Sequence, residues 1–118
     1  MKRHASCAID NDANKTEEAA PITTNEALDA VTKDFKRARF LAVDTEFIRE
    51  RTYYPQLCLI QISDGVISAA IDPLAKNLDL APVWALMRDE NITKVFHAGS
   101  QDMEIFLHLM GDLPRPIY

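Results

Sequence analysis

The sequence has little of what marks several large classes of protein. Only 2 of its 118 residues are cysteine, too few for the disulfide framework of a small secreted protein. No apolar run approaches the roughly 20 residues of a membrane span, and no apolar stretch follows the basic amino terminus as in a signal peptide. The net charge of −5 lacks the basic excess by which many domains hold nucleic acid. We therefore expect a cytoplasmic protein with no membrane contact and predict no protein partner.

What is present is the composition of one ordinary globular domain. Hydrophobic residues make up 47% of the chain, enough for a single modest core. Residues 1–21 are polar and have no apolar period, so we expect a disordered leader that ends at Pro21. Residues 22–118 are then the folded part, and the chain finishes in an extended, proline-containing run over 114–118.

Apolar spacing predicts two helices ahead of the last third of the chain. Thr23 and Glu26 have the spacing of a capping box, and apolar residues recur every three or four positions after it, which predicts a helix over about 24–38. A second helix is expected to start near Asp79, with Pro82 in its first turn.

Short apolar runs predict four strands, at 40–44, 57–62, 66–71 and 93–96. Asp64-Gly65 is a hairpin signal between the second and third strands, so the first three form an antiparallel meander. A helix separates the third strand from the fourth, so the fourth is expected to lie parallel to an earlier strand, most simply the first. The fold class is therefore α/β, a mixed sheet with flanking helices.

Two carboxylates end the first predicted strand. Asp44 and Glu46 are two residues apart, and because strand residues alternate between faces, both lie on one face, roughly 7 Å apart. Acidic residues are also common at strand ends and turns, so this pair alone leaves a structural role open.

A third carboxylate lies on an apolar helix face. A helix is expected from Ser100, as its N-cap, to Met110, with Gly111 in the stop position. Asp102 heads the face that continues with positions 105, 106 and 109. A carboxylate there needs a cation or hydrogen-bond donors, and a second capping role is the alternative.

The expected topology brings these carboxylates together. If the first and fourth strands are parallel neighbours, Asp44, Glu46 and Asp102 meet outside their carboxyl ends. Such hard oxygen ligands suit Mg²⁺ or Mn²⁺ and point to metal-assisted phosphoryl chemistry. His97 follows the fourth strand at the same edge, where it either faces substrate or makes a structural hydrogen bond.

Four segments then carry a family resemblance. They are FLAVDTEF at 40–47, RERTYYPQLCLIQ at 49–61, IDPL at 71–74 and KVFHAGSQDME at 94–104. The first resembles the first motif of the DEDD superfamily of 3′-5′ exonucleases, and the set is similar to ribonuclease D in particular. The last segment matches the second exonuclease motif. The resemblance spans about residues 22–118.

The resemblance implies a ribonuclease H-like fold and two-metal hydrolysis of RNA from its 3′ end, notably in tRNA maturation. It makes Asp44, Glu46 and Asp102 catalytic metal ligands for Mg²⁺ or Mn²⁺. It also suggests contacts with the terminal bases or nucleotide, with core packing as the alternative for the two apolar side chains. These substrate-binding candidates are Thr45, Phe47, His97 and Met103.

The chain also departs from the family pattern. The third motif, Tyr-x-x-x-Asp, does not occur in the 118 residues, and Tyr118 does not stand for its tyrosine. We therefore expect residues 22–118 to be the amino-terminal portion of an exonuclease domain, truncated at the carboxyl end, with weak or no activity of its own. A non-catalytic nucleic-acid-binding module and a degenerate fragment remain the alternatives.

Overall fold

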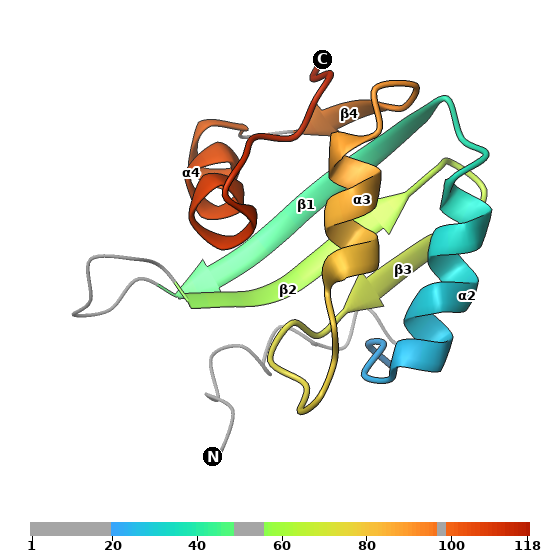
Figure 1. Cartoon of the computed structure of the whole chain (residues 1–118), viewed down its shortest axis with the longest axis vertical. Helices are drawn as coiled ribbons and strands as arrows, with labels where there is room; N and C mark the ends of the chain where they lie inside the picture. The colour runs from blue at the N-terminus through green and yellow to red at the C-terminus, as the bar shows by residue number, and fades with distance from the viewer. Residues whose placement is uncertain (1–19, 49–55, 97–98) are drawn as a thin grey trace.

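The computed structural model describes residues 20–48, 56–96 and 99–118. In this part of the chain a four-stranded sheet is flanked by three helices (Figure 1). The elements in chain order are α2 (Asn25–Phe35), β1 (Phe40–Ile48), β2 (Gln56–Ser63), β3 (Ser68–Ile71), α3 (Ala81–Arg88), β4 (Thr93–Phe96) and α4 (Gly99–Met110). This is the order that the sequence predicts. Of the expected leader at 1–21, only Ala20 and Pro21 fall within the described residues.

The sheet has the mixed topology expected from the sequence. Its strand order is β3-β2-β1-β4, with β1 and β3 antiparallel to β2 and with β4 parallel to β1. The register aligns Asp44 with Gln61 of β2, and Val43 with Phe96 of β4. The carboxyl ends of β1 and β4 therefore point in the same direction, toward the start of α4.

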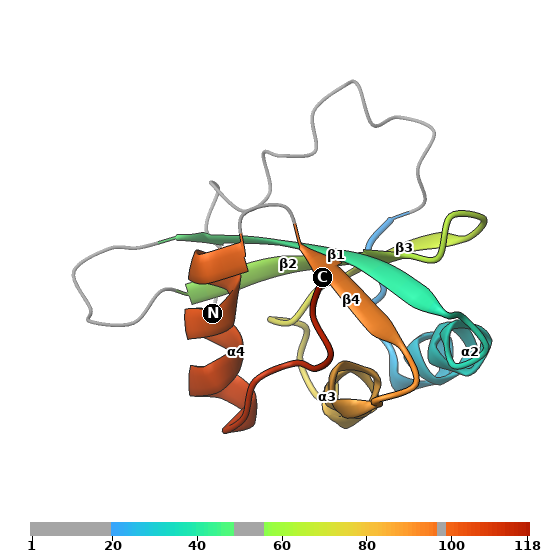
Figure 2. The ribbon, with the colours of Figure 1, turned by 90° about the horizontal axis from the view of Figure 1, so that it is seen from above.

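The two faces of the sheet differ. Helices α2, α3 and α4 all lie on one side of it, as the view from above shows (Figure 2). On that side Leu41 and Val43 of β1 are buried, whereas the alternate residues Ala42 and Asp44 are exposed. No described helix covers the second face, so β1 contributes its apolar side to the core and its acidic side to an open surface.

Helix α2 begins one residue later than the capping box predicts. Thr24, not Thr23, is the N-cap, and its hydroxyl accepts a hydrogen bond from the amide of Ala27 at 3.2 Å. Glu26 is then at the second helical position, where it complements the helix dipole instead of closing a capping box. The helix ends at Phe35 rather than near residue 38.

The other two helices also differ from expectation at their ends. Asp79 precedes α3 and accepts a hydrogen bond from the amide of Ala81 at 2.9 Å, so the helix proper starts two residues later. Helix α4 begins at Gly99, which places Ser100 inside the helix and not at its cap. Gly111 ends α4 with a φ of +76°, the conformation expected of a glycine stop.

The buried face of α4 shifts by one residue at its end. Asp102, Ile105 and Phe106 are buried as predicted, but Leu109 is 43% exposed and Met110 is buried in its place. A step of four residues from Phe106 keeps the side chain over the core in a helix of 3.6 residues per turn, whereas Leu109 turns outward.

The last residues run beside β4. The Lys94 amide donates to the carbonyl of Pro116 at 2.8 Å, and the Tyr118 amide donates to the carbonyl of Lys94 at 2.9 Å. Lys94 and Ile117 form a parallel bridge, so the extended run seen in the sequence continues the parallel part of the sheet. No described helix is both long and apolar enough to cross a membrane.

Candidate active site

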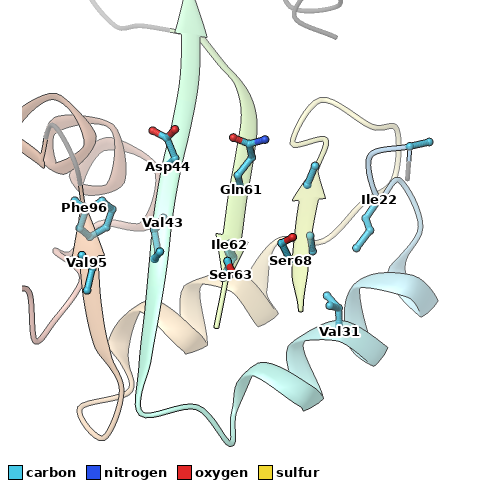
Figure 3. A pocket seen from close by; sticks show the side chains of 14 residues that line it. Ile22, Val31, Val43, Asp44, Gln61, Ile62, Ser63, Ser68, Val95 and Phe96 are labelled. Atoms are coloured by element: carbon cyan, nitrogen blue, oxygen red, sulfur yellow. The ribbon is translucent and has the colours of Figure 1, made fainter. Parts of the chain in front are cut away.

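The first carboxylate lies on the open face of the sheet. Asp44 projects from β1 beside Gln61 of β2, its partner in the strand register (Figure 3). The Asp44 side chain is exposed, and its Oδ1 accepts a hydrogen bond from the amide of Thr45 at 3.0 Å. Glu46 follows on the same face and is half-buried. Strand alternation therefore favours one direction for the two carboxylates, and the place of the Glu46 side chain stays a prediction.

A cavity of about 880 Å³ lies over this open face and reaches Asp44. Ser63 and Ser68 contribute hydroxyls to its wall, and Gln61 contributes an amide (Figure 3). Among the lining residues in the described part of the chain, Asp44 is the one ionisable side chain. The cavity therefore places a single carboxylate at the wall of a hollow that is otherwise neutral.

The second carboxylate belongs to the first turn of α4. Asp102 is 5% exposed and accepts a hydrogen bond on Oδ1 from the Thr45 hydroxyl. Burial raises the pKa of Asp102 above its ordinary value, and the negative charge of Asp44 raises it further, while the Thr45 hydrogen bond opposes both effects. The Asp102 carboxylate is thus held out of water and close to a second negative charge.

This arrangement fits a divalent cation. None of the ion pairs in the described part of the chain involves Asp102, so its charge is not balanced by a lysine or an arginine there. A cation between Asp44 and Asp102 would relieve their repulsion and offset the burial of Asp102. Among the described residues no three carboxylate, imidazole or thiol groups form one metal-binding cluster. Glu46 as a third ligand therefore stays a prediction.

The remaining predicted site residues are placed in different ways. Phe47 and Met103 are partly buried and pack against the hydrophobic core, and a contact of their remaining surface with the terminal bases stays a prediction. Thr45 directs its hydroxyl to Asp102. His97 lies outside the described residues, so its role stays a prediction.

Sequence reasoning missed Gln61 as a neighbour of Asp44. The signal was a polar residue inside the apolar run of the second predicted strand, at the position that faces away from the core. Only the register of the β1–β2 pair shows which residue of β1 lies opposite it.

Comparison with known proteins identifies the family. Residues 19–118 match the model of the family described as 3′-5′ exonuclease. Ribonuclease D of Zymomonas mobilis is 53% identical over 98 residues, an alignment that covers 82% of this chain and 25% of that protein. The chain thus spans about a quarter of the length of the curated relatives it matches.

Solved structures agree with the sequence comparison. The structure of Escherichia coli RNase D superimposes with a TM-score of 0.78 and 48% identity, covering 85% of this chain and 26% of that one. Brucella melitensis NrnC with bound Mg²⁺ superimposes with a TM-score of 0.61 and 30% identity, covering 70% of this chain and 41% of that one.

These likenesses settle the fold class and the family. The meander of β1, β2 and β3 with the parallel strand β4 is the ribonuclease H-like arrangement that the sequence predicts. The matched family consists of nucleases, which does not favour the alternative of a non-catalytic binding module. The chain belongs to the 3′-5′ exonuclease family.

Proposed function

We propose that this chain forms the metal-binding part of a 3′-5′ exoribonuclease, which removes nucleotides from RNA 3′ ends by hydrolysis. One observation carries the proposal. The parallel pairing of β1 with β4 brings the first turn of α4 beside β1, so that the charge of Asp44 acts on the buried carboxylate of Asp102. Two like charges that are close together and partly shielded from water are the arrangement by which proteins hold divalent cations.

The three carboxylates have distinct parts in this proposal. Asp102 supplies a buried ligand, and Asp44 supplies a ligand at the wall of the cavity. Glu46 follows Asp44 on the same face and would complete the set on the solvent side. Two bound Mg²⁺ or Mn²⁺ ions would supply an activated water and stabilise the leaving oxygen.

The relatives support RNA as the substrate. The E. coli RNase D structure is described as that of an exoribonuclease involved in structured RNA processing. We propose that Phe47 and Met103 contact the terminal bases, and that His97 and Thr45 lie near the terminal nucleotide. tRNA precursors in the cytoplasm are the substrates that the resemblance to ribonuclease D favours.

Metal-dependent binding of RNA tests this proposal directly. A 5′-labelled single-stranded RNA with a free 3′ hydroxyl is titrated with the chain, with and without Mn²⁺, and binding is followed by fluorescence anisotropy. We expect Mn²⁺ to strengthen binding in the wild type but not in Asp44→Asn. Asp29→Asn is the matched control, because Asp29 is exposed on α2 and lies away from the site.

Gel electrophoresis of the same samples measures hydrolysis of the RNA. Slow, Mn²⁺-dependent loss of single nucleotides from the 3′ end is expected at most, because the 118 residues contain no Tyr-x-x-x-Asp motif. RNA binding that needs no metal and survives Asp44→Asn would contradict the proposal and favour a simple binding module. A folded wild type that binds neither Mn²⁺ nor RNA would contradict it as well.

A further inference from the structure

We propose that Thr45 is a positioning residue, whose hydroxyl fixes the Asp102 carboxylate in the orientation that the cation requires. This inference rests on the proposed function and adds a residue that is not itself a metal ligand. It starts from a side-chain hydrogen bond between β1 and α4, in which the Thr45 hydroxyl donates to Oδ1 of Asp102.

Strand alternation separates Thr45 from its two acidic neighbours. Asp44 and Glu46 share the open face of the sheet, whereas Thr45 aligns with Ile60, whose side chain is fully buried on the helix-covered face. The tripeptide therefore presents carboxylates on one face and a hydroxyl on the other. That second face is the one against which α4 packs (Figure 2).

The hydrogen bond from Thr45 restricts the orientation of the buried Asp102 carboxylate. A short carboxylate at the start of a helix has several rotamers, and a ligand must be held near one of them to bind a cation well. The Thr45 hydroxyl engages Oδ1 of Asp102, and no other described side chain donates a hydrogen bond to that carboxylate. Oδ2 is then the oxygen left for a cation.

A neutral donor suits this position better than a charged one. A lysine or arginine beside Asp102 would orient the carboxylate but would also neutralise it and repel a divalent cation. A hydroxyl orients the carboxylate and leaves its full charge. Hydrogen-bond partners behind metal ligands typically change metal affinity by about 10- to 100-fold.

This geometry gives Thr45 a role in addition to the proposed position near the terminal nucleotide. Its hydroxyl is occupied by Asp102 at the edge of β1 beyond Val43, where the pairing with β4 ends, whereas the cavity that reaches Asp44 lies over the open face. A substrate contact and a positioning role also predict different results, because only a positioning role changes metal affinity in the absence of RNA.

The experiment measures Mn²⁺ affinity without RNA, by the loss of the electron paramagnetic resonance signal of free Mn²⁺. Thr45→Val keeps the shape and β-branching of the side chain and removes the hydroxyl, and Thr45→Ser restores the hydroxyl without the methyl group. We expect Thr45→Val to bind Mn²⁺ about 10-fold more weakly than the wild type. Thr45→Ser is expected to regain most of the affinity.

Thr32→Val is the matched control. Thr32 is also a buried threonine, but its hydroxyl donates within α2 to the carbonyl of Leu28 at 2.9 Å, far along the chain from Asp102. It is expected to bind Mn²⁺ like the wild type. Circular dichroism of every variant confirms that the fold is retained, and if Thr45→Val does not fold, the comparison of Thr45→Ser with the wild type carries the test.

The outcomes separate the two proposals. Thr45→Val binding as tightly as the wild type, while Asp102→Asn binds weakly, would overturn the positioning role and leave the proposed function intact. Thr45→Ser binding as weakly as Thr45→Val would also overturn it, because the methyl group would then be responsible. A wild type that binds no Mn²⁺ would overturn both proposals.

Discussion

The two faces of the sheet are built from alternate residues of the same strands, yet they have opposite character. On the face beneath the helices, Leu41, Val43 and Ile60 are almost wholly buried. On the open face, Asp44 and Gln61 lie beside a cavity (Figure 3). One face therefore stabilises the fold, and the other is free to carry charges that would be costly in a core.

Most of the site's charge lies where it costs the fold little stability. Asp44 is exposed on the open face, so its charge remains in contact with water. Asp102 is the exception, since it lies among the buried residues of α4 and its pKa is raised chiefly by burial. The loss of folding stability caused by the site therefore comes mainly from Asp102, which lies beside the helix-covered face of the sheet.

Neighbouring residues of β2 give the sharpest test of this difference. Ile60→Ala leaves a cavity in the core and is expected to lower the free energy of unfolding by about 4 kcal/mol. Gln61→Ala, at the next position on the open face, is expected to lower it by less than about 1 kcal/mol. Urea unfolding measures both. Equal effects would show that the open face is as important for stability as the core.

Lys94 is a charge on the covered face, and its removal should have the next largest effect. Lys94 is fully buried, and its ammonium donates to the carbonyls of Asp89, Ile92 and Arg115 at 2.6, 2.6 and 2.9 Å. Lys94→Met leaves these carbonyls without their donor, which is expected to cost about 3 kcal/mol. Urea unfolding measures the effect, and the control Lys33→Met, at an exposed lysine, should be as stable as the wild type. If Lys94→Met were also as stable as the wild type, the Lys94 ammonium would not be stabilising the last segment.

The same lysine predicts a dependence of stability on pH. Burial lowers the pKa of Lys94 from 10.5 to about 8. Between these pH values the unfolded chain keeps the proton and the folded chain loses it, so this group makes the free energy of unfolding rise with pH. The rise is expected to be about 3 kcal/mol at most and to be absent in Lys94→Met. Urea unfolding at several pH values measures it, and parallel curves for both proteins would contradict it.

The topology could be predicted from the sequence because local signals agree with one another. Short apolar runs, the Asp64-Gly65 turn and the crossover helix allow few arrangements, and the parallel pairing of 40–43 with 93–96 follows from them. The approach of Asp44 and Asp102 follows from that pairing in turn. Fold class and the main features of the site therefore depend on patterns that survive small errors in element boundaries.

The contacts between distant segments could not be predicted. Thr45 follows the first predicted strand and is a substrate-binding candidate by resemblance, but its bond to Asp102 depends on where α4 begins. Lys94 lies in a predicted strand, but its burial depends on carbonyls contributed by the loop before β4 and by the last segment, which no local pattern indicates. The predicted helix ends are wrong for the same reason, because the position of a cap depends on tertiary packing as well as on residue type.

The stability of Asp102→Asn, with and without Mn²⁺, tests most directly the claim that the site concentrates its cost in one residue. Asparagine can still accept the Thr45 hydrogen bond but carries no charge, so the metal-free variant is expected to be more stable than the wild type at neutral pH. Mn²⁺ should stabilise the wild type and leave the variant unchanged, and Asp29→Asn should behave as the wild type. A metal-free Asp102→Asn that is less stable than the wild type, or that Mn²⁺ stabilises equally, would contradict the account.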